Sequence, residues 1–223
     1  EIRLSLVGSE MCIRDRIENL RQTPIEEVEA YTFVADPNQR SYNIEITEGK
    51  ELPYEDLYTM EVDSSYNKVF TPQIVQGSWE TASNTPNSVI LTRSLARKIF
   101  GNDESPIGKR MILAQRLSTS PSTTPRTGGI SYTIQAVIED IPLNTSLSFL
   151  QQIDMLILND SEGILQFESN NNRTGGLGFA LLRPSKTPTQ LEARFRAMNL
   201  RHTMFKKEND VTASPFGKNF LEK

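Results

Sequence analysis

The chain has 223 residues, of which 37% are hydrophobic and 23% charged, and its formal net charge is −4. A chain of this length buries about 70% of its unfolded surface, so it needs neither a disulfide nor a metal ion to fold. Its single Cys and single His exclude an internal disulfide and a zinc site built from Cys and His. No apolar run approaches the roughly 20 residues of a membrane-spanning helix. The acidic balance gives no general attraction to nucleic acid.

The first sixteen residues are treated separately. Residues 5–16, SLVGSEMCIRDR, resemble the translation of a sequencing adapter. The alternative is a short strand over residues 2–7 that ends at Gly8. We interpret residues 1–16 as a non-native segment and leave them out of the fold prediction. Cys12 then says nothing about the redox compartment, and the upstream sequence is missing.

Three strands are predicted before residue 63. Residues 28–34 and 42–46 alternate between apolar and polar side chains, which is typical of half-buried strands. The turn signal Asp36-Pro37-Asn38 between them favours a hairpin of these two strands. Residues 57–62 form the third strand.

Two helices follow, with a strand between them. Asp63-Ser64-Ser65 is a helix-start signal before a short apolar turn at residues 66–70. After a brief strand at residues 88–91, residues 92–101 form the clearest helix. Thr92 can cap this helix, its apolar residues share one face, and Gly101 can close it.

The second half of the chain predicts further strands and one helix. Residues 109–117 and 130–141 are strands joined by a loop in which eleven of the twelve residues 118–129 are Ser, Thr, Pro or Gly. A strand at residues 179–183 precedes a helix that begins with Thr187 as cap and Pro188 at its first position. This order favours an α+β fold with mixed or antiparallel sheets.

No set of residues predicts a reaction site. Gly176-Leu177-Gly178 lacks the third glycine of a dinucleotide loop and leads into a strand. His202 is interpreted as a helix-end residue, and Glu139 and Asp140 would point to opposite faces of a strand. Trp79 could stack on a sugar or base, but we favour a partly buried anchor under a loop at residues 81–86. We therefore expect no catalytic, cofactor-binding or metal-binding residues, no cofactor and no enzymatic activity.

Charge is distributed unevenly along the chain. Residues 17–63 hold twelve Asp or Glu against three Lys or Arg, whereas residues 93–116 hold six Lys or Arg against two acids. Residues 183–223 hold nine basic residues against four acids. We interpret these runs as solvated faces, with a partner surface as the alternative.

A series of short motifs resembles one known family. In order, the motifs are Glu61-Val62-Asp63-Ser64-Ser65-Tyr66-Asn67-Lys68-Val69-Phe70, Val75-Gln76-Gly77, Ser88-Val89-Ile90-Leu91-Thr92, Leu95-Ala96-Arg97-Lys98-Ile99-Phe100-Gly101, Pro106-Ile107-Gly108-Lys109-Arg110 and Tyr132-Thr133-Ile134-Gln135-Ala136-Val137-Ile138-Glu139-Asp140-Ile141-Pro142. Together they closely resemble the MacB-like periplasmic core domain of FtsX-like ABC-transporter permeases. The resemblance covers residues 17–158, and more loosely residues 179–216. Residues 118–129 and 169–176 depart from it, at loops.

The resemblance implies an architecture of two subdomains. Residues 17–60 and 145–223 would form a porter-like subdomain, and residues 61–144 would form a sabre-like subdomain inserted into it. The chain would cross between them near residues 61–64 and 142–146. Membrane helices would stand just before residue 17 and soon after residue 223, outside this chain.

The resemblance also implies a function. The chain would be the extracytoplasmic, periplasmic part of a permease in the cytoplasmic membrane, and would couple ATP-driven motion of the membrane part to cargo or partners outside. Its partners would be an ABC ATPase subunit, a second permease copy or paralogue, and a periplasmic or outer-membrane protein, with no nucleic acid.

Two alternatives remain open. The first is an extracytoplasmic binding module for a peptide, lipid or glycan, which a deep pocket lined by aromatic residues would favour. The second is a hydrolase in which Asp140 or Asp154 meets an acid from residues 45–63.

Overall fold

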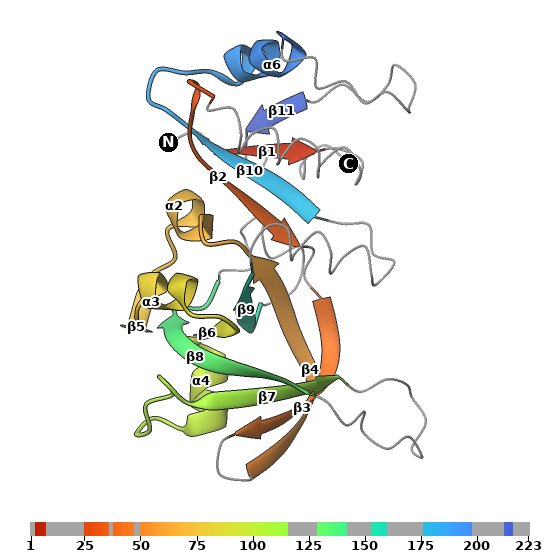
Figure 1. Ribbon diagram of the computed structural model, residues 1–223, viewed down its shortest axis with the longest axis vertical. Coiled ribbons are helices and arrows are strands. Elements are labelled where there is room, and N and C mark those ends of the chain that lie inside the picture. Colours follow the sequence, from red (N-terminus) through yellow and green to blue (C-terminus); the bar gives the residue numbers. More distant parts are fainter. Residues whose placement is uncertain are drawn as a thin grey trace. The chain divides into compact units, whose positions relative to one another are not determined.

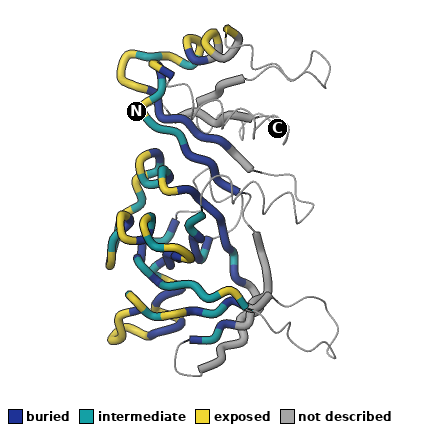
Figure 2. The backbone as a smooth tube through the Cα atoms, in the orientation of Figure 1, coloured by how far each residue is buried: buried dark blue, intermediate teal, exposed yellow. Residues whose placement is uncertain are grey.

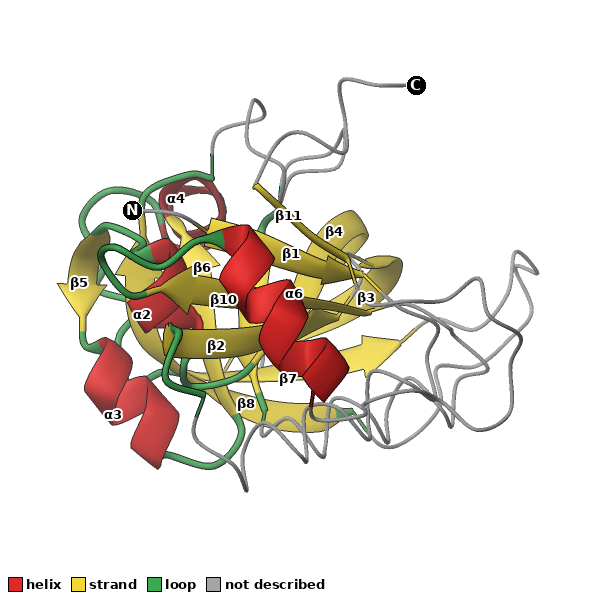
Figure 3. Cartoon of the chain, turned by 90° about the horizontal axis from the view of Figure 1, so that it is seen from above, coloured by secondary structure: helices red, strands yellow, loops and turns green. Residues whose placement is uncertain are grey.

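The structure is a computed structural model in which strands predominate and the helices are short (Figures 1 and 3). It describes residues 3–7, 25–35, 38–46, 50–115, 129–141, 153–159, 176–197 and 212–215. The chain divides into two compact units: unit 1 holds residues 1–36, 62–71 and 160–223, and unit 2 holds residues 37–61 and 72–159. None of the described helices is long and apolar enough to cross a membrane.

Unit 1 contains an antiparallel sheet and two helices. Its strands are β1 (Arg3–Val7), β2 (Val28–Ala35), β10 (Gly176–Leu182) and β11 (Thr212–Pro215), in the order β11-β1-β10-β2. The helix α2 (Tyr66–Phe70) packs on β2 and β10, and α6 (Pro188–Ala197) packs near β11. The strand β1 thus lies within residues 1–16, the segment interpreted as non-native.

Aromatic side chains join α2 to the sheet of unit 1. The rings of Tyr66 and Phe70 lie 4.8 Å apart, and the rings of Phe70 and Phe179 lie 5.0 Å apart, edge to face. Burial raises the pKa of the Tyr66 hydroxyl because the charged form would lose its hydration. These contacts give the short helix a stability that five residues alone would not have.

Unit 2 is a ring of paired strands. They are β3 (Asn38–Ile46), β4 (Lys50–Val62), β6 (Ser88–Thr92), β7 (Arg110–Gln115), β8 (Ile130–Ile138) and β9 (Met155–Leu158). The pairing order is β4-β3-β7-β8-β6-β9, and β9 also pairs with β4, so the circuit closes. Because β6 and β8 are parallel while β7 and β8 are antiparallel, the sheet is mixed, and the predicted α+β class is confirmed.

The core of unit 2 lies between these strands and α4 (Arg93–Phe100), and Figure 2 shows buried residues along β6 and β8. Leu95, Ala96, Ile99 and Phe100 are the buried face of α4, as their spacing predicts. The Thr92 hydroxyl accepts a hydrogen bond from the Leu95 amide at 3.4 Å, which confirms the predicted cap.

A short helix and a short strand in unit 2 were not predicted. The helix α3 (Trp79–Asn84) covers the first part of the expected loop 81–86, and its cap Ser78 accepts from the Thr81 amide at 3.3 Å. The strand β5 (Ile74–Gly77) pairs with β8. The Ser78 cap with Glu80 in the first turn was the available signal for α3.

The predicted hairpin of residues 28–34 and 42–46 is wrong. In the structure, β2 pairs with β10 and, at Val34, with Val62, whereas β3 pairs with β4 and β7. Both segments are strands, but their partners come from elsewhere in the sequence, and the turn signal at residues 36–38 lies where the chain passes from unit 1 to unit 2.

The unit boundaries also differ from the predicted subdomains. Residues 37–60 were expected to lie with the chain ends, but they group with unit 2 because β3 pairs with β7 and β4 with β9. Residues 62–71 group instead with unit 1. The unit 2 ranges are therefore inserted into unit 1 at two places in the sequence rather than at one.

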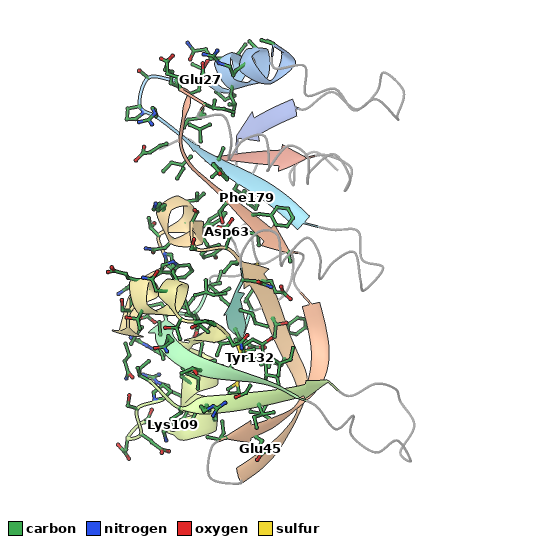
Figure 4. The ribbon with its side chains drawn as sticks, in the orientation of Figure 1. Glu27, Glu45, Asp63, Lys109, Tyr132 and Phe179 are labelled. Atoms are coloured by element: carbon green, nitrogen blue, oxygen red, sulfur yellow. The ribbon has the colours of Figure 1, made fainter. Side chains whose placement is uncertain are left out.

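Asp63 holds the end of β4 in unit 1, at the position labelled in Figure 4. Its buried carboxylate accepts from the Thr32 hydroxyl at 2.7 Å, the Phe33 amide at 2.9 Å and the Ser65 amide at 3.0 Å. The carboxylate therefore ties the residue before α2 to β2. A helix begins after the predicted start signal, but its cap is Ser65, whose side chain makes no capping bond.

Replacing Asp63 should weaken this connection. In Asp63→Asn, an amide donor replaces one acceptor oxygen and faces the N–H and O–H donors already there, at a cost of about 1–3 kcal/mol. Urea unfolding of the chain measures this cost. The exposed Asp103→Asn is the matched control, and equal stability of the two variants would contradict the prediction.

Gly77 is a position that only glycine fits. Its φ is +76°, and a Cβ there would stand 2.1 Å from the backbone oxygen of Gln135 in β8. Gly108 has a similar φ of +81°, but a Cβ there would have no neighbour within 4 Å. An alanine at Gly108 would therefore meet backbone strain alone, whereas an alanine at Gly77 would meet the same strain and a steric clash.

We expect Gly108→Ala to cost about 1–2 kcal/mol, the strain of a left-handed residue. Gly77→Ala should cost clearly more, because β5 must also move away from β8. Denaturant unfolding of both variants tests this order. A Gly77→Ala variant as stable as Gly108→Ala would show that β5 shifts without loss of pairing.

Candidate functional site

In unit 2, several hydrogen bonds meet at the start of α4. The backbone oxygen of Asp154 accepts from both the Thr92 amide at 2.9 Å and the Thr92 hydroxyl at 3.1 Å. Asp154 also exchanges bonds with Tyr58 of β4: its amide donates to the Tyr58 oxygen at 2.9 Å, and its carboxylate accepts from the Tyr58 amide at 2.9 Å. One residue thus joins β4, the segment before β9 and the cap of α4.

Two further acids, which follow β8, contact the first turn of α4. The Asp140 carboxylate accepts from the Ser94 amide at 2.9 Å and from the Ser94 hydroxyl, and Glu139 forms an ion pair with Arg93 at 2.5 Å. The two acids follow the last residue of β8, and both reach neighbouring residues of α4. The expectation that they point to opposite faces of a strand is wrong, because the strand ends at Ile138.

The ionisation of Asp154 is influenced by this setting. Burial raises the pKa of its carboxyl group, and the negative charge of Asp140 acts in the same direction. The hydrogen bond from the Tyr58 amide and the positive charge of Lys98 lower the pKa, but they do not cancel the desolvation. A charged Asp154 is therefore less favourable in the folded chain than in water.

Two acids that the hydrolase alternative proposed as partners of Asp140 or Asp154 have other partners. Of the acids that it proposed from residues 45–63, the Glu61 carboxylate accepts from Asn159 at 3.3 Å, and Asp63 is engaged with β2 in unit 1. Residues 47–49 and the side chains of residues 50–56 lie outside the described part. Among the described residues, no three His, Cys, Asp or Glu side chains gather as they would around a metal ion.

Three further sequence features were considered as possible sites: Trp79, residues 176–178 and His202. Trp79 is buried, with 7% of its surface exposed, which fits the anchor interpretation and not stacking on a ligand. Residues 176–178 belong to β10, as expected for the entry of a strand. His202 lies outside the described residues.

An open groove of about 440 Å³ lies beside α4. It is lined by residues of α4, β5 and β8 and of the loop 101–106, including the cations Arg93 and Arg97 and the acid Glu104. No aromatic side chain is part of this lining. The sequence offered only the basic excess of residues 93–116 as a signal for it.

The raised pKa of Asp154 predicts a pH-dependent effect of Asp154→Asn on stability. The ionised carboxylate costs stability above its folded pKa, and this cost disappears as the pH falls toward the unfolded pKa. Asparagine keeps an acceptor for the Tyr58 amide but carries no charge. Relative to wild type, Asp154→Asn should therefore be most favourable near pH 7 and become less so toward pH 4.

Urea unfolding across this pH range measures the difference, with the exposed Asp103→Asn as control. A difference between Asp154→Asn and wild type that is constant with pH would show that Asp154 is not desolvated in the folded chain.

Comparison with solved structures shows the same fold in three proteins. A domain of a protein assigned as a permease, from Porphyromonas gingivalis, has a TM-score of 0.60 and 23% identity over 96% of this chain and 89% of its own. The periplasmic region of MacB from Actinobacillus actinomycetemcomitans has a TM-score of 0.56 and 13% identity over 96% and 88%. The extracellular domain of the noncanonic ABC-type transporter YknZ from Gram-positive bacteria has a TM-score of 0.54 and 14% identity over 95% and 99%.

The sequence comparisons identify the family. None of the curated proteins matches the chain in sequence. One family does match, over residues 10–198, which is most of the chain. The resemblance noted in the motifs between residues 61 and 142 lies within that range. The chain belongs to the family of MacB-like periplasmic core domains.

Proposed function

We propose that this chain is the extracytoplasmic domain of an ABC-transporter permease, and that it couples ATP-driven motion of the membrane part to cargo or partners outside. The family membership and the folds of the permease and transporter domains support the first part. The division into two separately packed units is the observation that carries the second part. Such a domain acts by moving and contacting, and we assign it no catalytic role.

A mechanical coupler needs stiff bodies and defined places where the chain passes between them. Unit 2 is stiffened by its closed circuit of strands, and the segment 62–71 is fixed in unit 1 by Asp63 and the aromatic contacts of α2. The chain passes between the units at residues 36/37, 61/62, 71/72 and 159/160. We propose that motion occurs at these passages. The crossing expected near residues 142–146 lies outside the described residues.

The proposed partners follow from the same reasoning. An ABC ATPase on the inner face would drive the motion through the membrane part of the permease. A second copy or a paralogue would complete the permease, and a periplasmic or outer-membrane protein would receive the motion. The alternative of a ligand-binding module has one observation in its favour, the groove beside α4.

The coupling predicts that the two units move relative to each other during the ATP cycle. In the full permease with its ATPase and with Cys12→Ser, spin labels on the exposed residues Thr81 of unit 2 and Thr189 of unit 1 report the distance between the units. The distance distribution should differ between the nucleotide-free state and the state trapped with ADP and vanadate.

Two label pairs within single units are the controls: Thr81 with Asp103 in unit 2, and Lys68 with Thr189 in unit 1. Their distances should stay constant. An unchanged distance between the units in a transporter that hydrolyses ATP would rule out the coupling, and so would ATP binding by the isolated chain.

A further inference from the structure

The groove beside α4 has an uncompensated positive charge. The Arg97 side chain is exposed and lines the groove, and among the residues that the structure describes no ion pair reaches its guanidinium. The second cation of the lining, Arg93, is paired with Glu139. The acid of the lining, Glu104, is paired with Lys109, whose ammonium also lies 5.0 Å from the centre of the Phe100 ring. Arg97 therefore gives the groove a net attraction for anions.

The chemistry around Arg97 suits a carboxylate. A guanidinium presents parallel N–H donors that match the two oxygens of a carboxylate. The exposed side chains of Gln76 and Asn102, also in the lining, are further donors. Val75 and Ala96 provide apolar surface for the aliphatic stem of an acidic side chain. The groove thus combines one strong charge with polar and apolar walls.

The neighbouring strand is unsuited to pairing with an added strand. Only four residues form β5, and its pairing with β8 is interrupted between Ile74 and Gln76. Gly77 ends the strand with a positive φ. A short, irregular strand of this kind resists the addition of another strand at its edge. An occupant would therefore bind through its side chains and not through a backbone ladder.

We propose that this groove binds an acidic segment of a partner protein outside the membrane, with one carboxylate of that segment on Arg97. Anionic lipid surfaces are instead attracted by clusters of about 4–8 basic residues. The groove offers only Arg97 as a cation that no ion pair reaches among the described residues, between polar and apolar walls. A protein segment satisfies both features, because its acidic side chain meets Arg97 while neighbouring residues cover the walls. This inference concerns recognition and does not depend on the relative motion of the two units.

To test this, peptides that bind the complete chain are selected from a library of random short peptides. Selected peptides should contain Asp or Glu more often than the library does. Synthetic copies, measured by fluorescence polarisation, should lose roughly tenfold or more in affinity with Arg97→Glu, because a charge-assisted contact becomes a repulsion. Replacing the acid of the peptide by its amide should cost a similar factor.

Three further variants separate the groove from general charge. Lys68→Glu makes the same charge change on an exposed helical residue of unit 1 and should leave affinity unchanged. Arg97→Lys keeps the charge but loses the paired donors and should weaken binding less than Arg97→Glu. Gln76→Trp fills the groove without a charge change and should weaken binding. Circular dichroism and thermal unfolding verify that each variant is folded.

Several outcomes would overturn the proposal. Peptides that bind Arg97→Glu and wild type equally would place recognition elsewhere, and a library that yields no saturable binder would argue against any such site. Vesicles of phosphatidylcholine with phosphatidylglycerol that bind through Arg97, where acidic peptides do not, would assign the groove to lipid. None of these results bears on the distance measured between the units, so the two proposals fail separately.

Discussion

Asp154 is the residue on which the architecture of unit 2 depends. Through its backbone and its carboxylate it contacts Tyr58 of β4, and through its carbonyl it contacts Thr92, the cap of α4. The same residue therefore stabilises both the attachment of the segment before β9 to β4 and the start of α4. The carboxylate is partly desolvated in this role, and it gives the Tyr58 amide a hydrogen-bond acceptor.

Unit 1 is organised around a comparable carboxylate. Asp63 collects three donors from β2 and from the start of α2, so a segment that arrives from unit 2 is fixed within two residues of its entry. In both units a buried or half-buried Asp joins segments distant in sequence. The Asp63 carboxylate does so by accepting from two backbone N–H groups and a hydroxyl, whereas Asp154 uses its carboxylate, its amide and its carbonyl. Two separately packed units are what the proposed coupling of motion requires.

Local features were predictable from the sequence, and long-range pairing was not. The cap at Thr92, the buried face of α4 and the strands β6, β7 and β8 follow from spacing and capping within a few residues. The partners of β2 and β3 do not, because alternation identifies a strand but not its neighbour. The role of Asp154 was equally inaccessible, since its partners lie 62 and 96 residues away. The family was predicted from the series of motifs between residues 61 and 142, which periodicity alone could not have identified.

The position of Arg97 follows from the same construction. Asp154, Asp140 and Glu139 fix the first turn of α4, and its buried face fixes its rotation, so residues on the opposite side are presented in a set direction. Arg97 is on the final turn, where the helix dipole partly offsets its charge and where its carbonyl accepts from the Gly101 amide at 2.8 Å. The three acids that fix the first turn are bonded to Thr92, Ser94 and Arg93, and among the described residues no ion pair reaches Arg97. A carboxylate from outside is the chemical complement that this arrangement leaves room for.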